Sequence, residues 1–147
     1  MPVDLTPGEG RGMDLEQARS FVREHHRAVL GTLRGDGTPQ LSPVLAAVDD
    51  AGRIVVSTRA ATAKVHNLVR DPRAWLCVLP DEFFGDWIQV DGTAEVVRLP
   101  EAMPLLEDYF RRVSGEHDDW EDYRRAMREE DRVLLRIEPS RVGPARR

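Results

Sequence analysis

The sequence predicts an α+β fold that is mainly β, in which six strands form a closed barrel decorated by helices. Short β-like runs follow one another with turn sequences between them, at residues 35–37 and 49–52. Segments with helical spacing are inserted among these runs and do not alternate regularly with them. This order argues against a doubly wound parallel sheet. A length of 147 residues indicates one domain.

The first half of the chain predicts a tail, a helix and three strands. Residues 1–12 contain two prolines and three glycines and predict a flexible N-terminal tail, so that the single domain spans 13–147. Asp14 and Gln17 form a capping-box pattern that begins a helix reaching about residue 26. Strands are expected at 27–34, 40–48 and 53–58. Pro43 places the second strand at an edge, at a bulge, or where something other than a strand lies alongside.

The second half predicts three helices and three strands. Thr62 is the expected N-cap of a helix that ends before Pro72. Gly92 predicts a bend in a long strand, and Cys77 is interpreted as a buried core thiol and not a nucleophile. The remaining elements are expected as strands at 73–79, 86–99 and 132–137, helices at 100–113 and 118–130, a loop at 80–85 and a tail at 139–147.

Several classes of function are disfavoured by composition and by missing motifs. The net charge of -5 argues against nucleic-acid binding. Apolar runs fall short of the roughly 20 residues of a membrane helix, and the N-terminus has no secretion-signal pattern, so a cytoplasmic protein without membrane contact is expected. The four histidines form no metal-ligand spacing, and no metal site is expected. Motifs for a Ser/His/Asp triad, a Rossmann site or a P-loop are missing.

Lys64 is the only lysine among the 21 basic residues, and it stands at the start of a predicted helix. Helix N-termini attract anions through free N–H groups, and a compact ammonium suits phosphate. Between residues 59 and 73 four basic side chains oppose one acidic side chain, Asp71. These features predict a phosphate-bearing ligand, with a solvated surface lysine as the alternative.

A phosphate anchor without a nucleophile, a metal or a base suggests a redox cofactor that brings its own chemistry. Its flat ring would need an apolar slot, for which residues 40–44 offer polar and backbone contacts and Trp87 a stacking wall. For each of these residues taken individually, ordinary strand packing is the favoured explanation.

A set of segments distributed along residues 14–143 resembles a known family. They are residues 31–33, 37–44, 56–58, 62–68, 70–74, 91–94 and 115–120. Their order and spacing together resemble the pyridoxamine-phosphate-oxidase-like split barrels, and specifically the small actinobacterial branch that uses the deazaflavin coenzyme F420.

The resemblance implies a six-stranded split β-barrel, the FMN-binding split barrel, that forms a homodimer with two cofactor sites at its interface. It implies a coenzyme F420-dependent oxidoreductase that transfers a hydride to a small electron-poor organic acceptor. Trp87 would face the cofactor from the partner chain, and no catalytic side chain is identified. The cofactor-binding residues it implies are Gln40, Ser42, Pro43, Val44, Ser57, Thr58, Arg59, Thr62, Lys64, Asn67 and Trp87.

The chain departs from the family pattern beside the phosphate lysine. Members often carry an arginine one or two residues earlier, where this chain has Ala63 and Thr62, and Arg59 is the candidate substitute. Arg59, Arg70 and Arg73 are candidates to line a groove for the acidic tail of F420. Two alternatives stay open: an FMN-dependent oxidoreductase of the same fold, and a flavin- or deazaflavin-binding protein without turnover.

Overall fold

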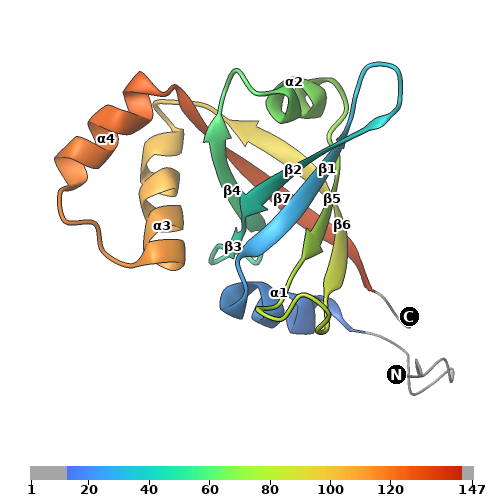
Figure 1. The fold of residues 1–147 in the computed structure, drawn as a ribbon. Helices are drawn as coiled ribbons and strands as arrows, with labels where there is room; N and C mark the ends of the chain where they lie inside the picture. Colours follow the sequence, from blue (N-terminus) through green and yellow to red (C-terminus); the bar gives the residue numbers. More distant parts are fainter. Residues whose placement is uncertain (1–12, 144–147) are drawn as a thin grey trace, which may run out of the picture.

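The computed structural model describes residues 13–143, and the predicted flexible tail at residues 1–12 lies outside this range. Four helices and one curled antiparallel sheet make up the described part of the chain (Figure 1). In chain order the elements are α1 Leu15–Glu24, β1 Arg27–Leu33, β2 Pro39–Leu45, β3 Ala47–Val48, β4 Ile54–Arg59, α2 Ala63–Arg70, β5 Arg73–Val78, β6 Ile88–Val97, α3 Ala102–Ser114, α4 Trp120–Glu129 and β7 Arg132–Gly143.

The sheet closes on itself because one segment supplies both of its edges. Its strand order is β2-β1-β5-β6-β7-β4-β3, and the two end strands are consecutive in the chain. The single strand predicted at 40–48 is therefore divided at Ala46, which gives seven strands where six were expected. The Ala46 N–H still donates to the His26 carbonyl at 2.7 Å beside β1, whereas Ala47 already pairs with Val55 of β4.

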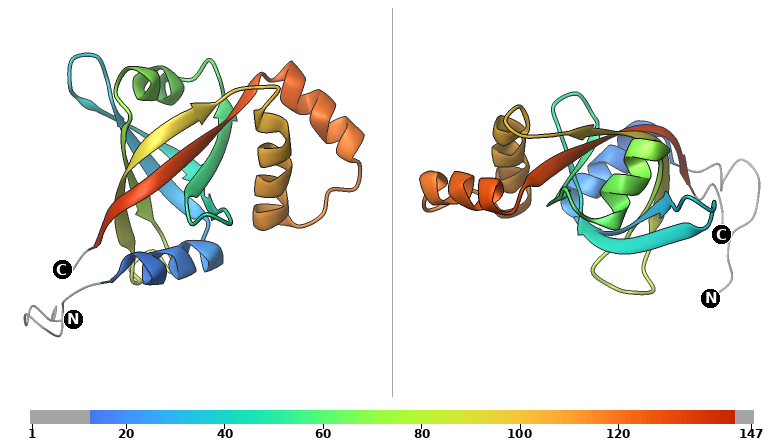
Figure 2. Two further views of the ribbon diagram at one scale, coloured as in Figure 1. Left: turned by 180° about the vertical axis from the view of Figure 1, so that it is seen from behind. Right: turned by 90° about the horizontal axis from the view of Figure 1, so that it is seen from above.

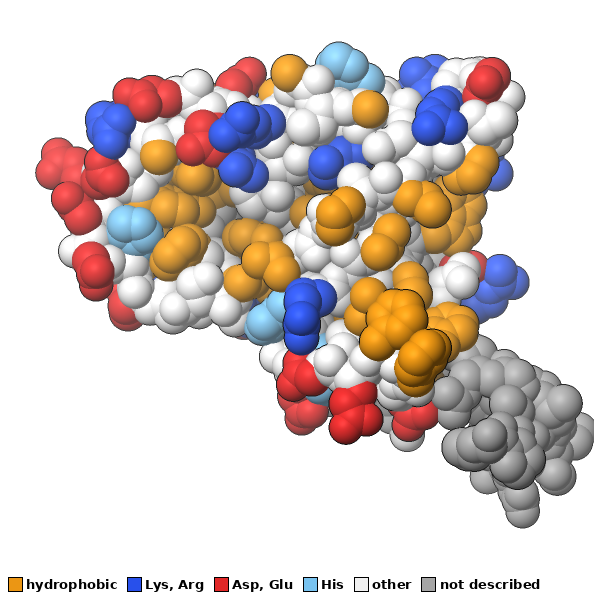
Figure 3. Space-filling model, viewed as in Figure 1, with side chains coloured by type: hydrophobic (Ala, Val, Ile, Leu, Met, Phe, Trp, Pro, Cys, Tyr) orange, Lys and Arg blue, Asp and Glu red, His pale blue; other side chains and the backbone are white. Residues whose placement is uncertain are grey.

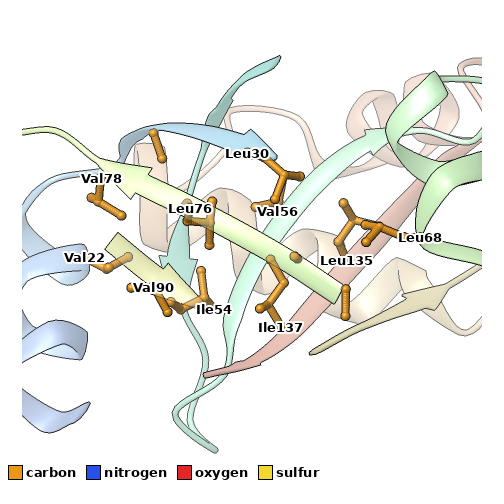
Figure 4. Close-up of a cluster of buried hydrophobic side chains, with 14 of the residues drawn as sticks. Val22, Leu30, Ile54, Val56, Leu68, Leu76, Val78, Val90, Leu135 and Ile137 are labelled. Atoms are coloured by element: carbon orange, nitrogen blue, oxygen red, sulfur yellow. The ribbon is translucent and has the colours of Figure 1, made fainter. Parts of the chain in front are cut away.

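The barrel interior is filled by aliphatic side chains from the strands and from two helices. Figure 4 shows this core, a single cluster that includes Val22 of α1 and Leu68 of α2 at its two ends and Leu30, Leu76 and Ile137 of the strands. Figure 2 shows α1 and α2 at opposite ends of the barrel and α3 with α4 to one side. A second buried cluster joins α3 and α4 to the outer face of the sheet through Val55, Leu106 and Leu134.

The barrel is split between β2 and β4. The β2 edge that faces away from β1 pairs with no strand in residues 13–143, and β4 pairs with β3 only at Ile54 and Val55. From Val56 to Arg59 the same edge of β4 is unpaired. Two free strand edges therefore border one opening, and the start of α2 follows directly from β4.

Several predicted details are confirmed. The Asp14 carboxylate accepts from the Gln17 N–H and the Gln17 side chain accepts from the Asp14 N–H, both at 2.8 Å, so the capping box is present. The sheet register shifts between Asp91 and Gly92, at the predicted bend. Pro43 lies in an edge strand.

Two predictions are wrong. The last strand continues to Gly143 and includes Pro139, where a tail was expected, because Pro139 pairs with Gly92 at the register shift and so interrupts no regular ladder. Cys77 is half-exposed on the outer face of β5, because alternate residues of that strand face outward. Partial burial raises the pKa of the Cys77 thiol.

Candidate functional site

An open pocket of about 800 Å³ lies along the free edge of β2, between the barrel and the helices α3 and α4. Figure 3 shows hydrophobic side chains gathered between the helix pair and the barrel, with basic side chains above them. The predicted site residues that line this pocket are Pro43, Val44, Ser57, Thr58 and Lys64. Segments that are separate in the sequence therefore meet at one cavity.

Lys64 lies at the basic end of the pocket without an anionic partner. Its ammonium makes no hydrogen bond and no ion pair with any residue between 13 and 143. Burial lowers the pKa of Lys64, and the neighbouring positive charge of Arg132 lowers it further. A partly buried cation beside a second cation is unfavourable unless an anion binds between them.

The second cation at this end is Arg132, and not Arg59. Arg132 lines the pocket and donates through Nε to Glu130 Oε1 at 2.8 Å, while Arg59 pairs with the same carboxylate at 3.5 Å outside the pocket. Arg132 lies directly opposite Arg59 in the register of β4 and β7. Arg132 has no signal in the sequence, because only the strand pairing brings it to Lys64.

The other arginines near Lys64 in the sequence are occupied elsewhere. Arg70 donates to the Leu33 carbonyl and to Asn67 Oδ1, both at 2.9 Å, and Arg73 pairs with Asp71 at 2.7 Å. Neither residue lines the pocket. The positive charge of the site therefore comes from Lys64 and Arg132, with Arg27 at the opposite end.

The first turn of α2 has unused backbone donors. Thr62 occupies the N-cap position, but its hydroxyl donates to the Arg59 carbonyl at 3.0 Å and caps no helix N–H. The first helical hydrogen bond is from the His66 N–H to the Thr62 carbonyl. The N–H groups of residues 63–65 therefore point from the helix start without a partner in the described chain.

The register of β2 determines which of its backbone groups face the opening. The Arg34 N–H donates to the Thr38 carbonyl and the Ala46 N–H donates to the His26 carbonyl, so even-numbered residues of this segment bond to β1. Because antiparallel pairs alternate, the odd-numbered residues 39–45 direct their backbone groups to the free edge.

Three of the four carbonyls on this edge are occupied by side-chain donors. Pro39 accepts from Arg34 at 2.9 Å, Leu41 from Gln40 at 3.3 Å and Leu45 from Tyr109 at 2.8 Å. The fourth carbonyl, that of Pro43, has no donor within residues 13–143 and belongs to a residue that lines the pocket.

Tyr109 of α3 bridges the two free edges where they diverge. Its hydroxyl donates to the Leu45 carbonyl of β2 and accepts from the Ser57 N–H of β4. Burial raises the pKa of Tyr109, against a smaller opposing effect of the Ser57 N–H. Tyr109 is a pocket residue that the sequence did not reveal, because a hydroxyl that bonds to backbone leaves no motif.

Gln40 and Ser42 face the barrel interior with oxygens that lack partners. Gln40 Oε1 and Ser42 Oγ are buried and make no hydrogen bond in the described structure. Their positions opposite Thr32 and Leu30 of β1 place them on the inner side of β2, beside the opening. Buried polar atoms of this kind require a ligand or a water as partner.

Asn67 and Trp87 lie away from the pocket of this chain. Asn67 is buried and donates to Thr32 Oγ1 at 3.0 Å, which ties α2 to β1. Trp87 is half-buried and directly precedes β6. Neither residue lines the pocket. Three other predicted site residues are also absent from its lining, namely Gln40, Ser42 and Thr62.

The pocket wall opposite β2 is aromatic and apolar. Phe110 of α3 and Tyr123 and Met127 of α4 form it, with the rings of Phe110 and Tyr123 5.2 Å apart. The Tyr123 hydroxyl donates to the Leu106 carbonyl at 2.8 Å, and burial chiefly raises the pKa of Tyr123 to about 12. The wall therefore remains uncharged over the physiological pH range.

An apolar surface adjoins the pocket on the outer face of the sheet. Leu41 is 65% exposed, and Val29 lies between Pro43 and Cys77 in adjacent strands. Phe83 and Phe84, in the loop before β6, are 73% and 92% exposed and in contact edge to face. Figure 3 shows hydrophobic side chains exposed over this part of the barrel.

Residues 13–143 lack two further features. No group of three or more His, Cys, Asp or Glu side chains there could hold a metal ion. None of the helices between these residues has the length and apolar character needed to span a membrane.

Comparison with known proteins gives a consistent family and a mixed set of structural relatives. A family model described as pyridoxamine 5'-phosphate oxidase matches residues 15–144. A conserved hypothetical protein of Mycobacterium tuberculosis is similar at 29% identity and a TM-score of 0.72, with 88% of this chain and 82% of that chain covered.

Two relatives whose names state a function are more distant. A structure named F420 reductase has 23% identity and a TM-score of 0.66 over 85% of this chain and 94% of that chain. The heme storage protein HutZ of Vibrio cholerae has 19% identity and a TM-score of 0.67 over 89% and 94%. At these identities the likeness shows a shared fold.

Proposed function

This chain belongs to the pyridoxamine 5'-phosphate oxidase family, and from this we propose that it is a coenzyme F420-dependent oxidoreductase acting on a small electron-poor organic acceptor. The observation that carries the proposal is the unpartnered ammonium of Lys64 at one end of a pocket whose wall is an unpaired strand edge. A phosphate at Lys64 and a flat ring along β2 would satisfy both features. The F420 reductase with the same fold supports the choice of cofactor.

The residues present fit a phosphate-bearing ring. Lys64 and Arg132 supply two positive charges, and Ser57 and Thr58 of the adjoining strand β4 also line the pocket. The orphaned oxygens of Gln40 and Ser42 lie beside the opening, where a ligand or an ordered water can donate to them. In this proposal Thr62 and Asn67 fix the start of α2, while Arg59 pairs with Glu130 outside the pocket and makes no contact with the cofactor.

A bound deazaflavin would supply the hydride chemistry, so the protein needs only to position it and exclude water. The free edge of β2, including Pro43 and Val44, would align the ring. Phe110, Tyr123 and Met127 form an apolar wall that excludes water from the opposite side and suits a flat, uncharged acceptor.

We propose that the working form is a homodimer. The exposed apolar residues Leu41, Phe83 and Phe84 adjoin the pocket, and such a surface is unusual for a protein that acts alone. A partner packed there would cover the open side of the pocket. Trp87, which does not line the pocket of its own chain, would then contribute to the site of the partner.

Titration of the purified protein with F420 and with FMN, followed by cofactor fluorescence, tests the proposal. We expect F420 to bind more tightly than FMN. Addition of quinone or nitroaromatic acceptors to the complex with reduced F420 should then restore the absorbance of oxidised F420.

Each alternative has its own signature in this experiment. Tight binding of FMN without binding of F420 would identify an FMN-dependent protein of the same fold. F420 binding without oxidation by any acceptor class would identify a binding protein without turnover.

A further inference from the structure

Resting on the proposed function, we propose that Tyr109 is a positioning residue of the site, a wedge that keeps the two free strand edges apart and so keeps the pocket open to a ligand. Its hydroxyl donates to the Leu45 carbonyl of β2 at 2.8 Å and accepts from the Ser57 N–H of β4. All three residues line the pocket. One side chain of α3 therefore contacts both edges at the opening.

The hydrogen-bonded pairs between β3 and β4 fall at odd-numbered residues. The Asp49 N–H donates to the Arg53 carbonyl at 2.9 Å in the turn that joins the two strands. Ala47 lies opposite Val55, two residues further along each strand. Because hydrogen-bonded pairs recur at every second residue of an antiparallel ladder, Ala47 and Val55 form the next pair.

The Tyr109 hydroxyl takes the place of the pair that would follow. Two residues beyond Ala47 and Val55, the same register would place Leu45 opposite Ser57. A continued ladder would join these residues directly, with the Ser57 N–H donating to the Leu45 carbonyl. The hydroxyl instead accepts from the first group and donates to the second, and the strands separate from this point.

The other half of this interrupted pair is left open to the pocket. The Leu45 N–H and the Ser57 carbonyl belong to the two free edges, and neither has a hydrogen-bond partner within residues 13–143. Without the wedge these groups can bond to each other, which would extend the ladder and narrow the pocket. With the wedge in place they stay available as a backbone donor and a backbone acceptor for a ligand.

Amide hydrogen exchange measured by NMR without ligand, together with the dissociation constant for F420, tests the wedge. Tyr109→Leu shortens the side chain, and Tyr109→Phe keeps the ring but leaves the Leu45 carbonyl and the Ser57 N–H without their partner. Ser140→Ala is the matched control. It removes a hydrogen bond from a side chain to the Asp91 carbonyl, between two strands that pair without it and away from the pocket.

In both Tyr109 variants we expect exchange of the Leu45 N–H to slow by about 10-fold, because this group pairs with the Ser57 carbonyl when the edges close. The affinity for F420 should fall by about 10-fold, because the ligand must then break this pairing to enter. Loss of a side chain that only stabilises the fold would make exchange faster. Ser140→Ala should change neither quantity.

Unchanged or faster exchange of the Leu45 N–H in a folded Tyr109 variant overturns the wedge. Slower exchange with unchanged affinity for F420 overturns the positioning role, because closure of the edges would then not affect the ligand. A wild-type protein that does not bind F420 overturns the proposed function, whereas the exchange rates, measured without ligand, still decide whether Tyr109 holds the edges apart.

Discussion

Lys64 combines three properties that rarely coincide in one surface-accessible side chain. It lines a pocket, it has no partner within the described part of the chain, and burial next to Arg132 lowers its pKa. Burial and the neighbouring positive charge are both unfavourable for an unpartnered ammonium in the free protein, and a bound anion would offset them. Residues that are destabilised in the free state in this way mark functional sites.

Replacement of Lys64 by alanine should weaken F420 binding by about 1–3 kcal/mol, because a hydrogen bond to a charged group is lost. The matched control is Arg59→Ala, which removes a nearby cation that pairs with Glu130 outside the pocket. Isothermal titration calorimetry measures both variants. Equal losses in the two would show a general effect of charge and remove Lys64 from the contact.

The affinity for F420 should also fall at alkaline pH. Bound anion stabilises the protonated ammonium, so the pKa of Lys64 is higher in the complex than in the free protein. Affinity is therefore full below the free-protein pKa and is lost as the pH rises through the pKa of the complex. Since the free-protein pKa is held below the ordinary 10.5, the decline should begin below that pH.

Dissociation constants measured from about pH 7 to about pH 10 test this pH dependence. Lys64→Arg should bind without the decline, because a guanidinium keeps its charge throughout this range. A wild-type profile that is flat, or one that the arginine variant reproduces, would assign the pH dependence to another group.

The sequence could predict the individual residues of the site only in part. Lys64 was identifiable as a lone lysine at a predicted helix start, and Ser57 and Thr58 were implied by the family resemblance. Arg132 and Tyr109 were not identifiable, because β-strand register and helix packing bring them to the pocket. Neither effect leaves a short-range pattern in the sequence.

At the scale of elements, the close contact between β6 and β7 depends on a glycine. A Cβ at Gly92 would lie 2.6 Å from the Glu138 carbonyl oxygen and 2.7 Å from Ile137 Cγ2. Both distances are shorter than real carbon contacts, and one of the two atoms belongs to the backbone. The register shift at this residue therefore requires the absence of a side chain.

Gly92→Ala should lower the free energy of unfolding by about 1–3 kcal/mol, the usual cost of overpacking. In Gly35→Ala the new methyl would lie 3.7 Å from Arg70 Cζ, an ordinary contact, so this control should change stability little. Urea denaturation compares the variants. A Gly92→Ala protein as stable as the wild type would mean that β7 shifts freely at this point.

Turns, caps and strands were largely predictable, because their signals are local. The capping box of α1, the bend at Gly92 and the positions of all four helices follow from short patterns. The division of the second strand at Ala46 was not predictable, since residues 44–48 are continuously apolar and contain no turn residue. The two halves differ only in their partner strands, since β2 pairs with β1 and β3 pairs with β4 when the sheet closes.

For the whole molecule, the exposed apolar face predicts self-association. Leu41→Arg should convert a dimer into a monomer, because it places a charge within a surface expected to be buried. Val69→Arg is the control, since Val69 is 62% exposed on α2 at the end of the barrel. Sedimentation equilibrium measures the mass of each variant. A monomeric wild type, or a dimeric Leu41→Arg, would contradict the proposed dimer.

The two prolines of β2 have a further consequence for the molecule in a crowded solution. An exposed strand edge is a template on which an extended peptide or a misfolded neighbour can add as another strand. At Pro39 and Pro43 the free edge of β2 lacks the N–H groups that such an added strand would need. The opening is thus protected from polypeptide while a small ring can still enter, so the barrel can remain split without becoming a site of aggregation.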